Sequence, residues 1–244
     1  MSALKKILTM EAPPYLRPEA LKFLRGLARN NNRDWFLPRK EIFETEIKAP
    51  MLAITRSVTN AMLDFAPDHV RPAEKSILRI YRDTRFSADK SPYKSQVAAW
   101  WSRAGLEKTS GGGFYFHVSA KEVTIAAGVY MPEREQLLRI RTWLLDHHDE
   151  VRKLLKDRKM RKCFSELDGL MLTRPPKGFP KEHPAMDLIL YRQWGVAASL
   201  PVEAALEKSF AKVIADHFRL AAPLVEALNT PLVAALKVGR KPLF

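Results

Sequence analysis

The chain has 244 residues, of which 46% are hydrophobic and 9% aromatic, a composition that excludes an intrinsically disordered protein and allows a substantial core. Its 41 Lys and Arg residues outnumber 27 Asp and Glu residues, which gives a formal net charge of +14. Such an excess favours anionic partners, without distinguishing nucleic acid, an acidic membrane surface and a phosphorylated metabolite. The alternative is an ordinary solvated surface that carries excess Lys and Arg.

The cysteine content and the lengths of the apolar runs exclude several classes of protein. Cys163 is the only cysteine, so an intrachain disulfide and a Cys-based zinc site are both excluded. A lone cysteine beside Phe164 is more typical of a buried small side chain than of a reactive thiol. The apolar run 7–10 is too short for the core of a signal peptide, and no run approaches the roughly 18 residues of a membrane span. We therefore expect a cytoplasmic protein with no membrane insertion.

The N-terminal part, residues 18–65, is predicted to be helical. Pro18 can occupy the first turn of a helix, and leucines follow it at helical spacing. The asparagines 30–32 interrupt this pattern, because Asn prefers caps and turns. Two further helices and a connector that contains prolines follow, over 35–47, 50–63 and 66–74.

The middle of the chain, residues 76–130, predicts a sheet. Four short segments are rich in β-branched and aromatic residues and are bounded by turn signals, namely 76–81, 96–102, 113–119 and 123–130. Short connections favour antiparallel neighbours, because parallel strands need long crossovers. The glycines 111–113 are expected to form a hairpin connection, since no helical pattern follows that could donate its N-terminal amides to a nucleotide phosphate.

Alternation within the third segment indicates two different faces of the sheet. Phe114 and Phe116 alternate with Tyr115 and His117. Successive side chains of a strand point to opposite faces, so one face is expected to be buried and the other to be functional or exposed.

The C-terminal half, residues 133–236, predicts a second helical region. Helices are expected around 137–144, 151–155, 202–217 and 220–236, with a rigid proline loop at 175–180 and a short basic tail at 237–244. Helices, then strands, then helices predict an α+β fold, in which an antiparallel sheet of about four strands is flanked by N-terminal and C-terminal helices. We expect a single domain over residues 1–244.

Familiar cofactor and metal motifs are missing from the sequence. There is no Walker-type phosphate loop, dinucleotide glycine fingerprint or nucleophile elbow. The run 146–149 contains two aspartates and two histidines, but adjacent helical residues point about 100° apart and cannot all face one ion. We therefore predict no metal site and no cofactor.

The basic run 152–162 is typical of a solvated helix face, although it could also follow a nucleic-acid backbone.

The segment 79–94, RIYRDTRFSADKSPYK, gives the strongest indication of a site. It places five cations near two carboxylates, Asp83 and Asp89, with aromatic residues between them. Closely spaced guanidinium groups repel one another unless carboxylates or an anionic ligand satisfy them. An irregular exposed loop of this composition can hold a phosphate or carboxylate. The alternative is a self-satisfied network of salt bridges, but two carboxylates leave some of the donors unpaired.

Four stretches of the sequence resemble one known family. They are NNNRDWF at 30–36, the segment 79–94, GVYMP at 128–132, and PKGFP at 176–180 with His183-Pro184. Together they resemble the bacterial and fungal family called "domain of unknown function 2461", over about residues 18–228. The resemblance implies a single domain that spans these motifs. It implies no activity, so it assigns no catalytic role to any residue.

The prediction for function is an anion-binding site for phosphate or carboxylate, with an anionic small molecule as the partner. Its expected ligand-binding residues are Arg79, Arg82, Arg85, Lys90, Tyr93, Lys94, Asn32 and Arg33. In an enzyme, the candidate acids or bases would be Asp83, Asp89 and His117. One alternative is a nucleic-acid-binding module with Tyr81, Tyr93, Trp100 and Trp101 as stacking residues. Another is a structural or partner-binding protein, and the oligomeric state stays open.

Overall fold

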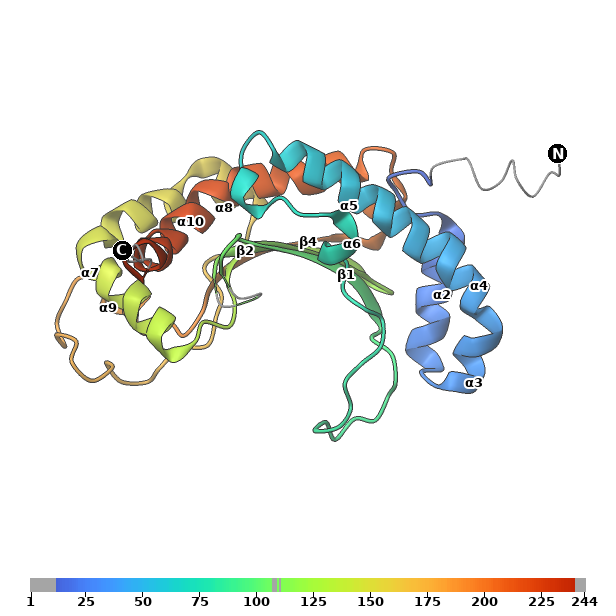
Figure 1. The fold of residues 1–244 in the computed structure, drawn as a ribbon, viewed down its shortest axis with the longest axis horizontal. Helices are drawn as coiled ribbons and strands as arrows, with labels where there is room; N and C mark the ends of the chain where they lie inside the picture. Colours follow the sequence, from blue (N-terminus) through green and yellow to red (C-terminus); the bar gives the residue numbers. More distant parts are fainter. Residues whose placement is uncertain (1–11, 107–108, 110, 240–244) are drawn as a thin grey trace, which may run out of the picture.

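An antiparallel four-stranded sheet forms the centre of the computed structural model, which describes residues 12–106, 109 and 111–239 (Figure 1). The spatial order is β1-β2-β3-β4, and every neighbouring pair is antiparallel. The strands are β1 (Gln96–Ser102), β2 (Gly113–Ser119), β3 (Glu122–Val129) and β4 (Trp194–Pro201). The predicted α+β class is confirmed, with helices before, after and within the run of strands.

The fourth strand is not the segment that the sequence indicated. Residues 76–81 were expected to be a strand, but Ser76 ends a short helix, α6 (Ala73–Ser76), which follows Pro72. The residues after it make only isolated bridges, Ile77 with Ala99 and Tyr81 with Tyr93. The true fourth strand, β4, lies in the region that was expected to be helical. Its period-two pattern is weak because glycine and alanine alternate with the buried side chains.

The N-terminal helices form as expected, although less regularly. The break at Asn30–Asn32 is confirmed, and the Asn32 side chain caps α3 by accepting a hydrogen bond of 2.9 Å from Trp35 N. The helices are α2 (Pro18–Arg29), α3 (Arg33–Phe36), α4 (Lys40–Ile42) and α5 (Ala49–Met62), with a 3-10 turn at Leu37–Arg39 and a π-helical stretch at Phe43–Lys48.

The C-terminal helices are longer than expected. Two helices were predicted within 133–156, but α7 runs unbroken over Arg134–Lys156, followed by α8 (Arg158–Cys163) and α9 (Met186–Ile189). Residues 202–217 and 220–236 were expected as two helices. Instead, Val202–Leu206 is a 3-10 turn and α10 (Phe210–Gly239) is one helix that includes Pro223 and Pro231. The first residues of the predicted tail continue α10, and residues 240–244 lie outside the described part of the chain.

One face of the sheet packs on α5 and α10, and the core lies between them. Phe114 and Phe116 on β2 are fully buried, as predicted from their alternation with Tyr115 and His117. Trp101 on β1 donates a hydrogen bond of 2.9 Å to Thr59 Oγ1 of α5. Phe218 of α10 lies with its ring centroid 5.4 Å from that of Trp101. Burying these large rings supplies much of the apolar contact between the layers.

The molecule has the shape of an arch, and the other face of the sheet is its open, concave side (Figure 1). Helices α2–α4 descend at one end of the arch, and α7 and α9 at the other. The connection between α6 and β1, which carries the segment 79–94, hangs on the concave side. No helix within the described residues is long and apolar enough to cross a membrane.

Candidate functional site

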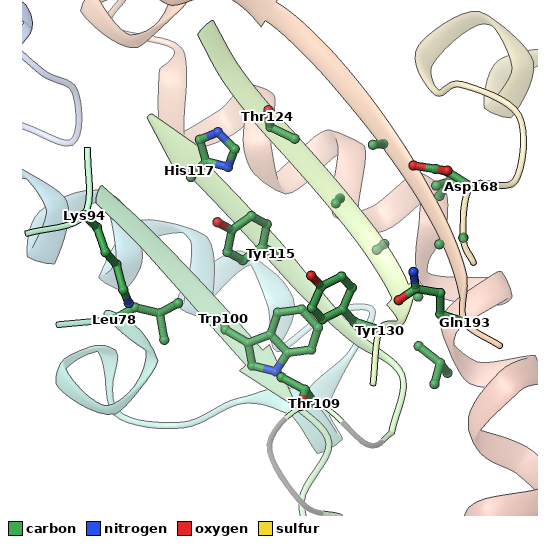
Figure 2. A pocket seen from close by; sticks show the side chains of 18 residues that line it. Leu78, Lys94, Trp100, Thr109, Tyr115, His117, Thr124, Tyr130, Asp168 and Gln193 are labelled. Atoms are coloured by element: carbon green, nitrogen blue, oxygen red, sulfur yellow. The ribbon is translucent and has the colours of Figure 1, made fainter. Parts of the chain in front are cut away.

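A cavity of about 690 Å³ lies on the concave face of the sheet (Figure 2). We call it the concave-face cavity. Its lining comes from all four strands and from segments at both edges of the sheet: Leu78, Lys94, Trp100, Thr109, Tyr115, His117, Thr124, Ala126, Ala127, Gly128, Val129, Tyr130, Asp168, Gly169, Gln193, Gly195, Val196 and Ala197. Its volume is within the range of about 300–1,000 Å³ that is usual for small-molecule sites.

The floor of the cavity over β3 and β4 carries almost no side chains. Gly128 lies opposite Gly195, and Ala126 lies opposite Ala197 in the antiparallel register. These residues alternate with Trp194 and Val196, which point to the helical face and are buried. The hollow therefore results from small residues at the concave-facing positions of two adjacent strands.

Aromatic side chains from β1 and β2 form the wall beside this floor. The ring centroids of Trp100 and Tyr115 are 6.0 Å apart, and those of Tyr115 and His117 are 5.6 Å apart. Gln96 Nε2 donates a hydrogen bond of 3.2 Å to Tyr115 Oη. Burial raises the pKa of Tyr115, so its hydroxyl stays protonated at neutral pH and can donate a hydrogen bond.

His117 is the one of the three predicted acid–base candidates that lines the cavity. Burial lowers the pKa of His117 below its usual value, although Glu122 opposes this shift. The imidazole is therefore neutral at pH 7. Its Nδ1 is buried and makes no hydrogen bond with the described residues. A neutral imidazole in a cavity can accept or donate one proton, as a general acid–base group must.

Lys94 lies at the β1 edge of the cavity, opposite Asp168 (Figure 2). Its backbone N donates a hydrogen bond of 2.7 Å to Ile80 O, which fixes the lysine beside the sheet. Burial lowers the pKa of Lys94, and the nearby positive charge of Arg79 lowers it further. Neither Lys94 nor Arg79 forms an ion pair with a described residue. Lys94 therefore lines this end of the cavity with a second cation, Arg79, nearby, and Arg79 in turn lies close enough to Asp83 to lower the pKa of that carboxyl.

The other cations of the motif are satisfied within their own loop. Arg82 pairs with Asp89, and Lys90 Nζ donates a hydrogen bond of 3.0 Å to Thr84 O. Arg85 binds Asp83 through Nε and Nη2 at 3.0 and 2.7 Å. The expected cluster of Arg82, Arg85 and Lys90 around one pocket is thus not formed, because the chain folds back and brings each group to a partner within seven residues.

The two carboxylates of the motif are poorly suited to acid–base chemistry. The Arg85 side chain, followed by its backbone amide, lowers the pKa of Asp83. Hydrogen bonds from Ser91, then from the Arg82 guanidinium, hold the pKa of Asp89 well below its usual range. Neither residue lines the concave-face cavity. Both carboxylates form ion pairs with arginines of the same loop.

Tyr93 and the asparagines attach the motif to the N-terminal helices. Tyr93 is buried and stacks on Phe36, with ring centroids 4.0 Å apart. Asn31 Nδ2 donates to Tyr93 O at 2.8 Å, and Tyr93 N donates to Asn31 Oδ1 at 3.1 Å. Asn32 caps α3, Arg33 is exposed, and neither lines the cavity. The structure therefore gives Tyr93 and Asn32 contacts that hold the fold together.

Several cavity residues were missed from the sequence. Asp168 and Gln193 come from the region after α8, which showed no sheet pattern. Asp168 N donates to Gly195 O at 2.7 Å, and Gly195 N donates to Asp168 O at 3.1 Å, so this segment pairs with the outer edge of β4. Only recognition of β4 from its alternating Trp194 and Val196 could have pointed to them.

The structure also places the two candidate stacking tryptophans and one arginine of the basic run. Trp100 and Trp101 lie on opposite faces of β1 as expected, with Trp101 fully buried and Trp100 in the cavity. In the basic run, Arg152 binds Asp187 at 2.7 Å and Asp149 at 3.3 Å. The described residues contain no group of three His, Cys, Asp or Glu side chains that could hold a metal ion.

Comparison with known proteins identifies a family. The family model described as "Conserved hypothetical protein (DUF2461)" matches residues 19–226, which include the sheet, the motif 79–94 and all of the cavity lining. A search of the curated proteins finds no match.

Proposed function

The chain belongs to the DUF2461 family of conserved hypothetical proteins, and we propose that it binds an anionic small molecule at the Lys94 end of the concave-face cavity. The molecule's phosphate or carboxylate group contacts Lys94, with Arg79 nearby to add positive charge. The aromatic wall and the hollow floor hold the rest of the molecule.

The observation that carries this proposal is the position of Lys94, which lines the cavity, forms no ion pair with a described residue and has Arg79 nearby. Lys94 is partly buried, and Arg79 lies close enough to lower the pKa of Lys94. Like charges held together in partial burial are unfavourable without a counter-charge. A bound anion relieves this repulsion and accepts charge-assisted hydrogen bonds, which are stronger than neutral ones. Arg82 and Arg85 already have carboxylate partners, so they offer a ligand much less.

Titration calorimetry of Lys94→Gln against the wild-type protein tests this function. Phosphate, pyrophosphate and a tricarboxylate serve as the probes. We expect saturable binding by the wild type and an affinity at least tenfold lower for Lys94→Gln, because one charge-assisted contact is worth about 1.5–3 kcal/mol. Binding should weaken as salt is added, since the site is partly open to solvent.

Lys121→Gln is the matched control, because it removes one positive charge from an exposed turn between β2 and β3. It should bind the probes as the wild type does. An equal loss of affinity in both variants would show that net charge alone attracts the anion. Absence of binding by the wild type would contradict the proposal directly.

A further inference from the structure

We infer that the ligand of the concave-face cavity is a planar aromatic ring joined to its anionic group by a linker about the length of a sugar, the chemistry of a nucleoside monophosphate. This inference rests on the proposed function, because it places the phosphate at Lys94. It adds that the ring lies over the floor of β3 and β4 and that Asp168 binds the ring's far edge.

The floor is shaped for a flat group. Gly128 and Gly195 face each other across β3 and β4, with Ala126 and Ala197 beside them, so nothing larger than a methyl group rises from this part of the sheet. A Cβ atom added at Gly195 would make only ordinary van der Waals contacts, at 3.7 Å with Asp168 O and 3.9 Å with Ala127 O, and Gly195 lines the cavity. A planar ring can therefore lie close to the backbone here.

The wall supplies aromatic surface at the edge of this floor. Trp100 and Tyr115 rise from the neighbouring strands, with 50° between their ring planes, and Trp100 is only partly buried (Figure 2). Aromatic faces of this kind stack on the rings of bases and on other unsaturated rings, and they do so with little regard to ring identity.

The separation of the charged groups sets the length of the ligand. Lys94 precedes β1, and Asp168 pairs with Gly195 on β4, at the other edge of the sheet. Asp168 lies one step beyond β4, so four steps between strands of about 4.8 Å separate Lys94 from Asp168 by about 19 Å. After the reach of the two side chains is subtracted, a ligand of about 10 Å can contact both. Inorganic phosphate is too short, whereas a nucleoside monophosphate has this length.

The far end of the cavity offers a hydrogen-bond acceptor. The Asp168 carboxylate forms no ion pair with a described residue, and two backbone hydrogen bonds to Gly195 hold its segment against the floor. A carboxylate accepts hydrogen bonds and donates none when ionised. The ring should therefore present a donor at that edge, such as the amino group of adenine or cytosine.

A ligand series separates the ring from the phosphate. Adenosine monophosphate, ribose 5-phosphate, inorganic phosphate and adenosine are titrated into the wild-type protein. We expect adenosine monophosphate to bind at least tenfold more tightly than ribose 5-phosphate. It should also quench tryptophan fluorescence, and Trp100→Phe should lose most of that quenching while it keeps the affinity within about threefold, because phenylalanine still stacks.

Filling the floor tests where the ring lies. Gly195→Val adds a β-branched side chain that suits a strand and occupies space in the cavity. It should reduce the affinity for adenosine monophosphate to that of ribose 5-phosphate and leave inorganic phosphate binding at Lys94 unchanged. Ala197→Val is a second variant on the same floor, in case Gly195→Val unfolds. Ser199→Val lies on the same strand and face but outside the cavity, and it should bind as the wild type does.

The outcomes distinguish this inference from the proposed function. If ribose 5-phosphate and adenosine monophosphate bind equally well and both depend on Lys94, the anion site stands and the ring is wrongly assigned. If neither binds, both proposals fail. If a single-stranded oligonucleotide binds at least tenfold more tightly than adenosine monophosphate, the cavity serves a nucleic acid, and the assignment to a small molecule is overturned.

Discussion

His69 is buried beside the connection between β1 and β2, where its Nε2 lies 3.1 Å from Gly112 O. Burial lowers the pKa of His69 to about 4, although the hydrogen bond to Gly112 opposes the shift. The imidazole must therefore be neutral in the folded protein at neutral pH, and it donates from Nε2 to the carbonyl oxygen. This single side chain links the stability of the fold to pH.

Acidification should destabilise the protein through His69. The unfolded chain binds a proton on this residue below about pH 6.5, whereas the folded protein does so only near pH 4, so stability is lost as the pH falls between these values. We expect a loss of about 2.5 kcal/mol between pH 7 and pH 4.5, measured by urea unfolding. In His69→Gln most of this loss should disappear. The exposed His147→Gln is the control, and an unchanged pH dependence in His69→Gln would contradict the assignment.

At the scale of elements, α10 holds the β1–β2 connection in place. Asn229 of α10 is fully buried, and its amide binds both backbone groups of Gly112, accepting from N at 2.7 Å and donating to O at 3.1 Å. Asn229 belongs to the second half of α10, a single helix of 30 residues where two were expected. Prolines normally disrupt a helix, but packing of α10 along the sheet outweighs the cost at Pro223 and Pro231.

Removing this amide should be costly. In Asn229→Ala the buried Gly112 N–H loses its acceptor, so the free energy of unfolding should fall by about 3 kcal/mol. Thr230→Ala removes an exposed hydroxyl one residue away and should change stability by no more than about 0.5 kcal/mol. Chemical denaturation of both variants measures the difference. Similar losses of stability in the two variants would show that the hydrogen bonds between Asn229 and Gly112 contribute little to the stability of the fold.

In the molecule as a whole, the two faces of the sheet have different roles. The convex face packs on α5 and α10 and contains the buried aromatic core, whereas the concave face holds the cavity (Figure 1). Trp101 and Trp100 are adjacent on β1, and Trp101 lies on the buried convex face whereas Trp100 lies on the concave face. We therefore expect Trp101 to contribute mainly to the stability of the fold and Trp100 mainly to ligand binding.

Substitution of each tryptophan tests this division. Trp101→Ala removes a fully buried ring and its hydrogen bond to Thr59, so we expect a loss of about 4 kcal/mol in the free energy of unfolding. Trp100→Ala should cost about 1 kcal/mol, because its ring is partly exposed. Thermal and urea unfolding of the pair provide the comparison. Equal losses would mean that the concave face is part of the core.

The fold class, three of the four strands and the positions of the first helices could be predicted from the sequence, because these features depend on local signals. The alternation of Phe114 and Phe116 with Tyr115 and His117 was enough to assign the buried and open faces of β2. The family was also recognisable from its motifs. Local patterns did not reveal β4, because Gly195 and Ala197 have weak strand preferences and gain their conformation from pairing with β3.

The charged residues that line the cavity could not be predicted from the sequence, because their positions depend on packing between distant segments. Arg82 and Arg85 carry the same charge as Lys94 in the sequence, but the loop turns back and neutralises them with Asp89 and Asp83. Lys94 is left beside the sheet, and Asp168 joins the cavity from 74 residues further along the chain. A side chain's partners depend on how distant segments pack, and spacing along the chain does not contain that information.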